Sequence, residues 1–327
     1  MNFFLSLFKL LPPELAHKAA LISLNILYKL KILNLFFSKF EDQEYEFLGM
    51  RLKNRLGTAA GLDKDGDFID CLGALGFGFL EVGTVTPKPQ NGNPKPRVFR
   101  LFDEQAVINR LGFNNKGVDH LVKKLKSKKF MGIVGVNIGA NKNSKDQKRI
   151  DDYIECFRKV YKYSDYITVN ISSPNTPGLR DLHDLDNIKN LILNIENEAK
   201  LNNFNRPIFL KVSPDESAET IKSIADLINL SNLTGLIISN TTINKEILHN
   251  KKNIDIDGGL SGAPLMKKST EILKAISNHD PQLPIIGVGG VMCKSDFNEK
   301  INSGASLVQI YTGFIINGPK IVSEILN

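Results

Sequence analysis

Asparagines stand at several positions where a short apolar run gives way to polar residues, namely Asn109, Asn137, Asn170, Asn175 and Asn240. Each amide side chain can both donate and accept hydrogen bonds. One asparagine in a loop is by default a turn residue. Several that converge suit a flat, neutral ring rich in C=O and N–H groups, such as a pyrimidine or an isoalloxazine. Lys64 and Lys211 stand at similar positions and could neutralise a carboxylate or a reduced flavin, although an isolated lysine is more often a solvated surface charge.

Glycines and hydroxyl side chains follow two apolar runs near the end of the sequence. The pair GG (289–290) follows the run 285–288, and YTG (311–313) follows the run 307–310. Backbone N–H groups in such loops and at helix N-termini can hold a phosphate group. A single glycine pair usually just makes a turn, but two such loops in succession predict a phosphate site.

Other common kinds of site have no counterpart in the sequence. No Ser/His/Asp triad and no acidic cluster is evident, so no metal site is predicted. The five histidines fall mostly on predicted helices or polar loops and are interpreted as structural or solvated, with His17 as the exception. The widely spaced Cys71, Cys156 and Cys293 form no CxxC pair, which argues against a disulfide scaffold or a zinc site and indicates a reduced compartment.

The elements that must position these residues alternate regularly from about Phe47 onward. Eight short apolar runs typical of buried strands are each followed by a longer stretch typical of a helix. Eight units favour a closed (β/α)₈ TIM barrel of the α/β class over an open sheet, with its chemistry at the carboxyl ends of the strands. The predicted strands are Leu56–Ala60, Phe79–Val85, Ile133–Ile138, Tyr166–Ile171, Ile208–Val212, Gly235–Ile238, Ile285–Val288 and Leu307–Ile310. The predicted helices are Phe68–Leu75, Val118–Lys126, Lys148–Tyr163, Leu185–Leu201, Ser217–Leu230, Met266–Ser277, Lys294–Asn302 and Pro319–Leu326.

Two segments depart from this alternation. Residues 97–110 predict a β-hairpin on one face of the barrel. Residues 1–40 predict an N-terminal two-helix extension, divided at Pro12-Pro13, and residues 41–46 predict a linker to the barrel of residues 47–327. No stretch of about 18 residues in the extension lacks a charge, which argues against a transmembrane span. The extension also lacks the features of a secretory signal or a transit peptide.

The second helix of the extension carries an apolar stripe at helical spacing, formed by Leu15, Ala19, Ile22, Ile26 and Leu30. The pattern alone favours packing of this stripe against a core. The alternative is a membrane-surface element whose lysines face anionic headgroups. Residues 1–40 hold five lysines against one glutamate, so the extension has a net charge of +4.

Composition limits the class of protein and of partner. The chain has 327 residues, is 42% hydrophobic and carries a formal net charge of +7. It can therefore bury a sizeable core, and disorder is excluded. The positive charge allows nucleic acid, an acidic membrane surface or an acidic small molecule as partner. Because the extension carries +4 of this charge, the other 287 residues together carry only +3, which argues against nucleic acid.

Eight segments of the predicted barrel carry distinctive motifs, which are AAGLDKDG (59–66), VGTVTPKPQNGNPKPR (82–97), INRLGFNN (108–115), NISSPNTPGLR (170–180), SNTT (239–242), GGLSG (258–262), IIGVGG (285–290) and VQIYTGF (308–314). Together they closely resemble the dihydroorotate dehydrogenase family, in particular its membrane-associated, quinone-dependent class 2. The resemblance covers about residues 47–327 in family order, and NISSPNTPGLR is highly specific. The family fold is an FMN-binding (β/α)₈ barrel, which agrees with the independent strand count.

The resemblance implies a flavoenzyme that oxidises (S)-dihydroorotate to orotate in pyrimidine (UMP) biosynthesis. Ser173 matches the family's catalytic base, which takes the C5 proton while a hydride leaves C6 for N5 of FMN. Thr176 matches its relay partner, and Phe113 lines that path. One non-covalent FMN per chain is implied, held by Ala60, Thr84, Asn137, Asn170, Lys211, Ser239, Gly262, Gly290, Tyr311 and Thr312. The implied substrate residues are Lys64, Asn109, Arg110, Leu111, Gly112, Phe113, Asn170, Asn175, Asn240 and Thr241.

In the extension, the resemblance implies a hydrophobic tunnel from the membrane to the flavin. His17 and Arg100 resemble the polar pair that meets the quinone head. The expected partners are dihydroorotate or orotate, a membrane quinone and a peripheral membrane surface, with no nucleic acid. The expected state is a monomer on the cytoplasmic face of a bacterial inner membrane.

Two alternatives to this function remain open. One is another FMN barrel oxidoreductase, such as a dihydrouridine synthase-like enzyme acting on RNA, which would need a basic groove and typically a catalytic cysteine in a strand-end loop. The other is a non-catalytic membrane-binding protein on a barrel, against which the intact base loop argues.

Overall fold

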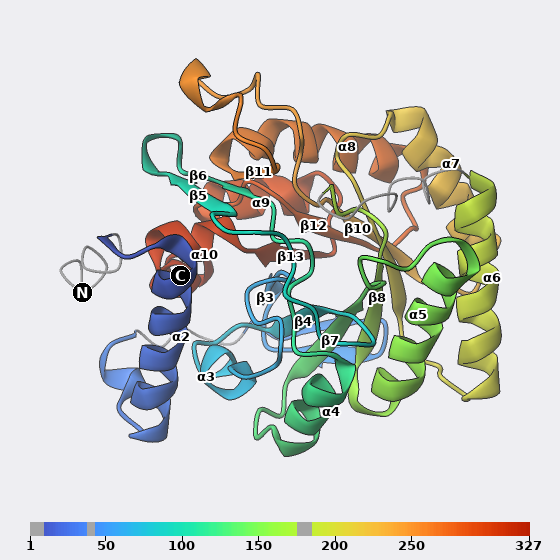
Figure 1. Ribbon diagram of the computed structural model, residues 1–327, viewed down its shortest axis with the longest axis horizontal. Helices are drawn as coiled ribbons and strands as arrows, with labels where there is room; N and C mark the ends of the chain where they lie inside the picture. Colours follow the sequence, from blue (N-terminus) through green and yellow to red (C-terminus); the bar gives the residue numbers. More distant parts are fainter. Residues whose placement is uncertain (1–9, 38–42, 175–184) are drawn as a thin grey trace.

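The computed structural model describes residues 10–37, 43–174 and 185–327. Figure 1 shows a central barrel of strands surrounded by helices. The strands close in the order β10-β12-β13-β3-β4-β7-β8-β9, and all neighbours are parallel. The predicted (β/α)₈ barrel is therefore confirmed. Its strands are β3 (Leu56–Thr58), β4 (Phe79–Val85), β7 (Ile133–Ile138), β8 (Tyr166–Asn170), β9 (Ile208–Val212), β10 (Gly235–Ile238), β12 (Ile285–Val288) and β13 (Leu307–Ile310).

Helices follow the strands and cover the outside of the barrel, most of them with one buried apolar face. Helix α7, for example, begins after Ser217, whose hydroxyl accepts a hydrogen bond from the backbone N–H of Thr220. It buries Ile221, Ile224 and Ile228 at the spacing of successive helical turns. The helices of the barrel are α3 (Ile69–Gly73), α4 (Val118–Ser127), α5 (Asp146–Val160), α6 (Leu185–Leu201), α7 (Ala218–Asn229), α8 (Met266–His279), α9 (Lys294–Asn302), α10 (Thr312–Asn317) and α11 (Ile321–Leu326).

Aromatic side chains close the barrel at the amino ends of its strands. Phe79, Tyr166 and Phe209 meet inside the barrel, with Tyr166 edge-on to Phe209 at 5.7 Å between ring centroids. The hairpin of β1 (Tyr45–Phe47) and β2 (Met50–Leu52) packs Phe47 beneath them, so β1 begins within the segment expected to be a linker. Since this end is filled, a ligand can enter the barrel only from the carboxyl ends of the strands.

A second sheet of three strands stands beside the mouth of the barrel. It contains the predicted hairpin, β5 (Val98–Leu101) and β6 (Ala106–Asn109), and a third strand, β11 (Gly259–Gly262), paired antiparallel with β6. The strand β11 is not among the predicted strands, although it lies within the motif GGLSG (258–262). The physical reason is that GLSG has little intrinsic strand preference. Its partner strand, β6, lies about 150 residues earlier in the chain, so local sequence patterns could not predict the pairing.

The extension contributes helix α2 (Pro13–Lys29), which lies against α3 and β5 at the side of the barrel (Figure 1). Its buried side chains are Ala16, Leu21 and Leu24. The prediction that the apolar stripe packs on a core is wrong, because four of its members are exposed: Leu15, Ile22, Ile26 and Leu30. Helical spacing identified one apolar face of α2, but the helix has a second apolar face that includes Leu21 and Leu24. Only the contact of α2 with the barrel decides which of the two faces is buried. The helix expected before Pro12 lies almost entirely outside the described residues.

None of the helices in the described ranges has both the length and the apolar character needed to cross a membrane.

Candidate active site

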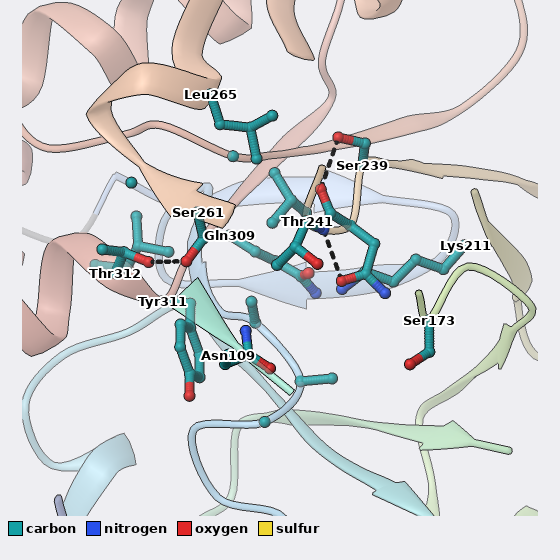
Figure 2. A pocket seen from close by; sticks show the side chains of 18 of the residues that line it. Asn109, Ser173, Lys211, Ser239, Thr241, Ser261, Leu265, Gln309, Tyr311 and Thr312 are labelled. Carbon is teal, nitrogen blue, oxygen red and sulfur yellow. Dashed lines mark hydrogen bonds between the residues drawn. The ribbon is translucent and has the colours of Figure 1, made fainter. Parts of the chain in front are cut away.

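A pocket opens at the carboxyl ends of the barrel strands and is partly covered by the three-stranded sheet (Figure 2). Its walls come from almost every strand end, as the fold requires. The residues predicted to hold a flavin that line it are Ala60, Thr84, Asn170, Lys211, Ser239, Gly262, Gly290, Tyr311 and Thr312. The predicted substrate residues that line it are Lys64, Asn109, Leu111, Gly112, Phe113, Asn170, Asn240 and Thr241.

Four residues predicted for the flavin, the substrate or the proton relay stand elsewhere or cannot be placed. Asn137 lies beneath the pocket, fully buried, and Arg110 points outward, where its guanidinium donates to the carbonyl of Pro96 at 3.0 Å. Asn175 and Thr176 fall outside the described residues. Sequence spacing could not separate Arg110 from its neighbours, because adjacent residues of a loop can face opposite ways.

Buried amides at the ends of β4, β7 and β8 hold one another in fixed orientations. The Thr84 hydroxyl donates to Asn137 Oδ1 at 2.6 Å, and Asn170 Nδ2 donates to the same oxygen at 3.1 Å. Asn137 Nδ2 in turn donates to Glu81 Oε1 at 2.9 Å. Because each amide is oriented by its neighbours, Asn137 acts below the pocket by fixing how Thr84 and Asn170 present their polar atoms to it.

The carboxylate of Glu81 is at the centre of a polar layer inside the barrel. It is almost wholly buried and accepts hydrogen bonds from the Tyr166 and Thr168 hydroxyls, both at 3.0 Å, and from Gln309 Nε2 at 2.8 Å. Neither Glu81 nor Gln309 was predicted from the sequence. Each lies within an apolar strand, where a single polar residue gives no signal of its role.

Two polar atoms at the floor of the pocket, Lys211 Nζ and Gln309 Oε1, have no hydrogen-bond partner among the described residues. The ammonium of Lys211 is buried and has no hydrogen-bond partner among the residues that the structure describes. Burial lowers the pKa of Lys211, and the charge of Glu81 opposes that shift. Gln309 also lines the pocket, and its buried Oε1 accepts no hydrogen bond in the described structure (Figure 2). A buried polar atom without a partner is rare in proteins. A ligand with N–H and C=O groups fits this floor.

Ser173 lines the pocket on the loop that follows β8, next to the strand β9 that carries Lys211, and is 5% exposed (Figure 2). Its neighbour Ser172 donates to Asn170 Oδ1 at 2.8 Å and accepts from Asn240 Nδ2 at 2.9 Å. This network anchors the start of the loop at β8 and joins it to the end of β10. Phe113 lines the pocket in a left-handed conformation with φ of 51°.

Lys64 supplies a cation at the pocket rim. Its ammonium donates to Asn114 Oδ1 at 2.5 Å. Burial and, to a smaller extent, the nearby Arg97 lower the pKa of Lys64 to about 8, against an opposing effect of Glu14. Asn114 was not singled out, although its position in the motif INRLGFNN placed it within the candidate segment.

The opposite end of the pocket is lined by glycines and hydroxyls. Thr312 Oγ1 donates to Ser261 Oγ at 2.8 Å, as Figure 2 shows. Gly290, with φ of 86°, packs so closely on the start of α8 that a Cβ there would lie 2.3 Å from the Cα of Met266. Such a surface of backbone and hydroxyl groups beside a helix N-terminus has the chemistry to hold a phosphate. Ser261 was missed because β11 was not predicted.

The predicted quinone pair lies where α2 meets the barrel. His17 Nε2 is 2.9 Å from the carbonyl oxygen of Leu62, and burial lowers the pKa of His17 to about 4, so the imidazole is neutral. Arg100 donates to the carbonyl of Leu11 at 2.5 Å. The pKa of Tyr311 in the pocket is raised to about 12, mainly by burial and partly by the charge of Glu14 on α2. Gly61, which lines the pocket, directly precedes Leu62, so this part of the pocket lies close to α2.

No group of three or more histidine, cysteine, aspartate or glutamate side chains in the described part of the chain could hold a metal ion. The fold and the pocket together define a (β/α)₈-barrel protein whose pocket offers polar groups suited to a flat, polar ring and to an anionic group.

Comparison with known proteins identifies the family. The family model for dihydroorotate dehydrogenase matches residues 43–327, and the chain belongs to this family, in its quinone-dependent class 2. Curated relatives described as dihydroorotate dehydrogenase (quinone) include one from Saccharophagus degradans, 48% identical over 97% of this chain and 95% of the relative. Another, from Escherichia coli O1:K1, is 46% identical over 97% of this chain and 96% of the relative.

Solved structures agree with this membership. The ligand-free dihydroorotate dehydrogenase of Eimeria tenella superposes with a TM-score of 0.88 at 34% identity, covering 96% of this chain and 92% of that one. Its complex with ferulenol gives a TM-score of 0.86, again at 34% identity, covering 96% and 89% of the two chains. The chain is thus an enzyme, a quinone-dependent dihydroorotate dehydrogenase, which decides between the alternatives that the sequence left open.

Proposed function

We propose that this chain binds one FMN non-covalently and oxidises (S)-dihydroorotate to orotate for pyrimidine (UMP) biosynthesis, passing the electrons to a membrane quinone. The observation that carries the proposal is the convergence of Ser173, Lys64 and the strand-end amides on a pocket whose floor holds the Lys211 ammonium, which has no partner among the described residues. Bound FMN would supply the hydride acceptor, its N5 atom. The chain would supply a base, an orienting set of amides and two fixed positive charges.

The cofactor residues fall into a polar floor and a phosphate end. Thr84, Asn170 and Lys211 would meet the ring, and the lysine would oppose negative charge that develops near flavin N1. Gln309 would accept from a ring N–H with its buried Oε1. Other predicted cofactor residues lie along the same pocket: Ala60, Ser239, Gly262, Gly290, Tyr311 and Thr312.

The substrate residues lie above that floor. Lys64 would pair with the substrate carboxylate, and the amides of Asn109, Asn170 and Asn240 would bond the pyrimidine ring. Ser173 would take the proton from C5. Thr176 and Asn175, outside the described residues, remain proposed as the proton relay and a substrate contact. For Arg110 only its backbone is proposed to shape the site, since its side chain points away.

Anaerobic mixing of the purified protein with dihydroorotate tests this function. The absorbance of oxidised flavin should be lost within a single turnover, whereas orotate alone should shift the spectrum without reducing the flavin. Flavin that is bound but stays oxidised in dihydroorotate would overturn the proposed reaction.

The charge state of Lys64 predicts a pH dependence for orotate binding. Because its pKa is lowered to about 8, Lys64 is cationic below that pH and becomes neutral above it. An anionic ligand favours the cation, so the Kd of orotate should be flat below about pH 7 and rise by about 10-fold per pH unit above about pH 8. Flavin difference spectra at each pH measure this Kd. Lys64→Met should weaken binding at neutral pH and remove the rise.

We further propose that the extension delivers the quinone from the membrane as a peripheral element, on the cytoplasmic face of a bacterial inner membrane, with the enzyme a monomer. The exposed apolar side chains of α2 lie on the same helix as the exposed Lys18 and Lys29. An apolar face flanked by lysines is typical of a helix that lies in an anionic membrane interface. His17 and Arg100 would meet the quinone head.

His17→Ala tests the quinone path without disturbing the rest of the extension. Reoxidation of reduced flavin by a lipid-like quinone should slow by about 10-fold, while reduction by dihydroorotate should stay within about 2-fold. Ser23→Ala, an exposed change on the same helix that alters no charge, is the matched control. Equal quinone rates in His17→Ala and the control would exclude this role. Deletion of residues 1–40 is a poorer test, because it also removes Glu14, which pairs at 2.7 Å with the buried Arg97.

A further inference from the structure

The side chain of Lys300, on helix α9, is buried in the barrel wall with no exposed surface. Its ammonium donates to Ser269 Oγ on α8 at 2.6 Å. The stem of the side chain passes close to β12, since a Cβ added to Gly287 would lie 3.5 Å from Lys300 Cδ. A lysine is rarely buried so completely unless its charge is compensated.

No carboxylate in the described structure forms an ion pair with this ammonium. The two acids that act on it, Glu299 and Asp296, belong to its own helix. Glu299 is exposed, and Asp296 accepts a hydrogen bond from the backbone N–H of Met292 at the start of α9. Burial accordingly lowers the pKa of Lys300 to about 7. The described protein thus provides a buried positive charge without a partner of opposite sign.

Ser269 connects this charge to the back of the glycine loop at the pocket. Its Oγ lies 3.0 Å from the carbonyl oxygen of Gly289, 2.9 Å from that of Leu265 and 3.1 Å from that of Met266. Gly289, Gly290 and Leu265 all line the pocket. Because Lys300 donates to the serine oxygen, the serine proton is free to hold one of these carbonyls. Lys300 and Ser269 therefore stand directly behind the wall at the proposed phosphate end.

We propose that Lys300 is the buried counter-charge for the phosphate of the flavin and that, with Ser269, it is a positioning residue for the loop that holds this group. The inference rests on the proposed FMN function. A dianion in front of Gly289 and Gly290 would supply the opposite charge that Lys300 lacks, across a wall of low dielectric where attraction is strong. The ammonium itself does not touch the ligand and acts through the serine and the loop.

The inference predicts that Lys300 sets the preference for FMN over riboflavin, which lacks the phosphate. The full-length holoprotein is equilibrated with mixtures of FMN and riboflavin, and bound flavins are separated and quantified. Lys300→Met keeps the length of the side chain and removes its charge, and it should lower the FMN-to-riboflavin affinity ratio by about 10-fold or more. Ser269→Ala should lower the ratio in the same direction by a smaller factor. Lys294→Met, an exposed charge removed from the same helix, should leave the ratio unchanged.

Each outcome of this competition decides something different. If Lys300→Met weakens both flavins equally, or leaves the ratio as in the wild type, Lys300 is only a structural residue and the inference is wrong. Ser269→Ala provides the same decision should Lys300→Met fail to fold. If the wild-type protein itself shows no preference for FMN, the proposed FMN site fails first, and the inference fails with it.

Discussion

Replacing Ser173 with alanine is expected to slow the anaerobic reduction of bound flavin by dihydroorotate by about 10²-fold or more, the usual effect of losing a general base. Ser173 lines the pocket on the loop that follows β8, and its neighbour Ser172 is held by Asn170 and Asn240. The start of the loop that carries Ser173 is thereby anchored beside β9, the strand that carries Lys211. Stopped-flow absorbance at saturating dihydroorotate measures the rate directly.

A serine hydroxyl has a pKa far above 7, so Ser173 needs a route for the proton. Ser173→Cys should restore part of the lost rate and move its pH profile to lower pH, because a thiol has a lower pKa than a hydroxyl. Ser213→Ala is the matched control: Ser213 is a buried serine after the neighbouring strand β9 and does not line the pocket. Its rate should stay within about 2-fold of the wild type. Flavin reduction at the wild-type rate in Ser173→Ala would exclude Ser173 as the base.

The barrel was predictable because each of its strand–helix units has a recognisable local sequence pattern. An apolar run such as Ile133–Ile138, buried on both faces, is recognisable without knowledge of its neighbours. The eight predicted strands lie within two residues of the observed ones at each end. What local patterns could not give is pairing over long distances, and β11 joined to β6 is the clearest case.

The pocket walls were predictable for the same reason, since strand ends of a parallel barrel must meet at one mouth. The polar layer around Glu81, beneath the pocket, was not predictable in this way. Glu81 and Gln309 are single polar residues in apolar strands, and their importance comes from mutual contacts that only the closed barrel creates. The burial of Lys300 could not be predicted either, because a lysine on a helix that covers the outside of a barrel, such as α9, is usually solvated. Its complete burial follows from the packing of α9 on the barrel.

The extension shows that apolar periodicity alone does not identify which face of a helix is buried. Spacing identified an apolar stripe on α2, but it is Leu21 and Leu24 that are buried, while Ile22 and Ile26 are exposed. Nor does spacing reveal that Glu14 bonds Arg97, whose guanidinium also donates to the carbonyl of Asn93 at 2.9 Å. The extension is therefore joined by a half-buried ion pair to a loop beside the pocket.

Replacing Lys211 with methionine is expected to slow flavin reduction by about 10²- to 10³-fold, the effect of removing one preorganised charge from an active site. The reason is the position of the ammonium at the pocket floor, buried and without a partner in the described residues. Negative charge that accumulates on the ring would find its stabilising cation already in place. Methionine fills nearly the same volume, so the change removes charge with little effect on packing.

The same substitution should lower the midpoint potential of the bound flavin. Removing the cation destabilises the anionic reduced flavin but has little effect on the neutral oxidised flavin. A pH profile adds a second check. Burial lowers the pKa of Lys211, so the residue is charged at low pH and loses its charge below the pH expected of an ordinary lysine. The wild-type rate should therefore fall on the alkaline side, and Lys211→Met should lack that limb.

Spectroelectrochemical titration of the holoprotein measures the potential, and stopped-flow absorbance across pH measures the rate. Lys189→Met, which removes an exposed charge from helix α6, should change neither quantity. If the potential of Lys211→Met equals that of this control, Lys211 does not stabilise the reduced ring. A slower rate would then have to come from altered flavin or substrate binding, which the difference spectra of orotate would detect as a raised Kd.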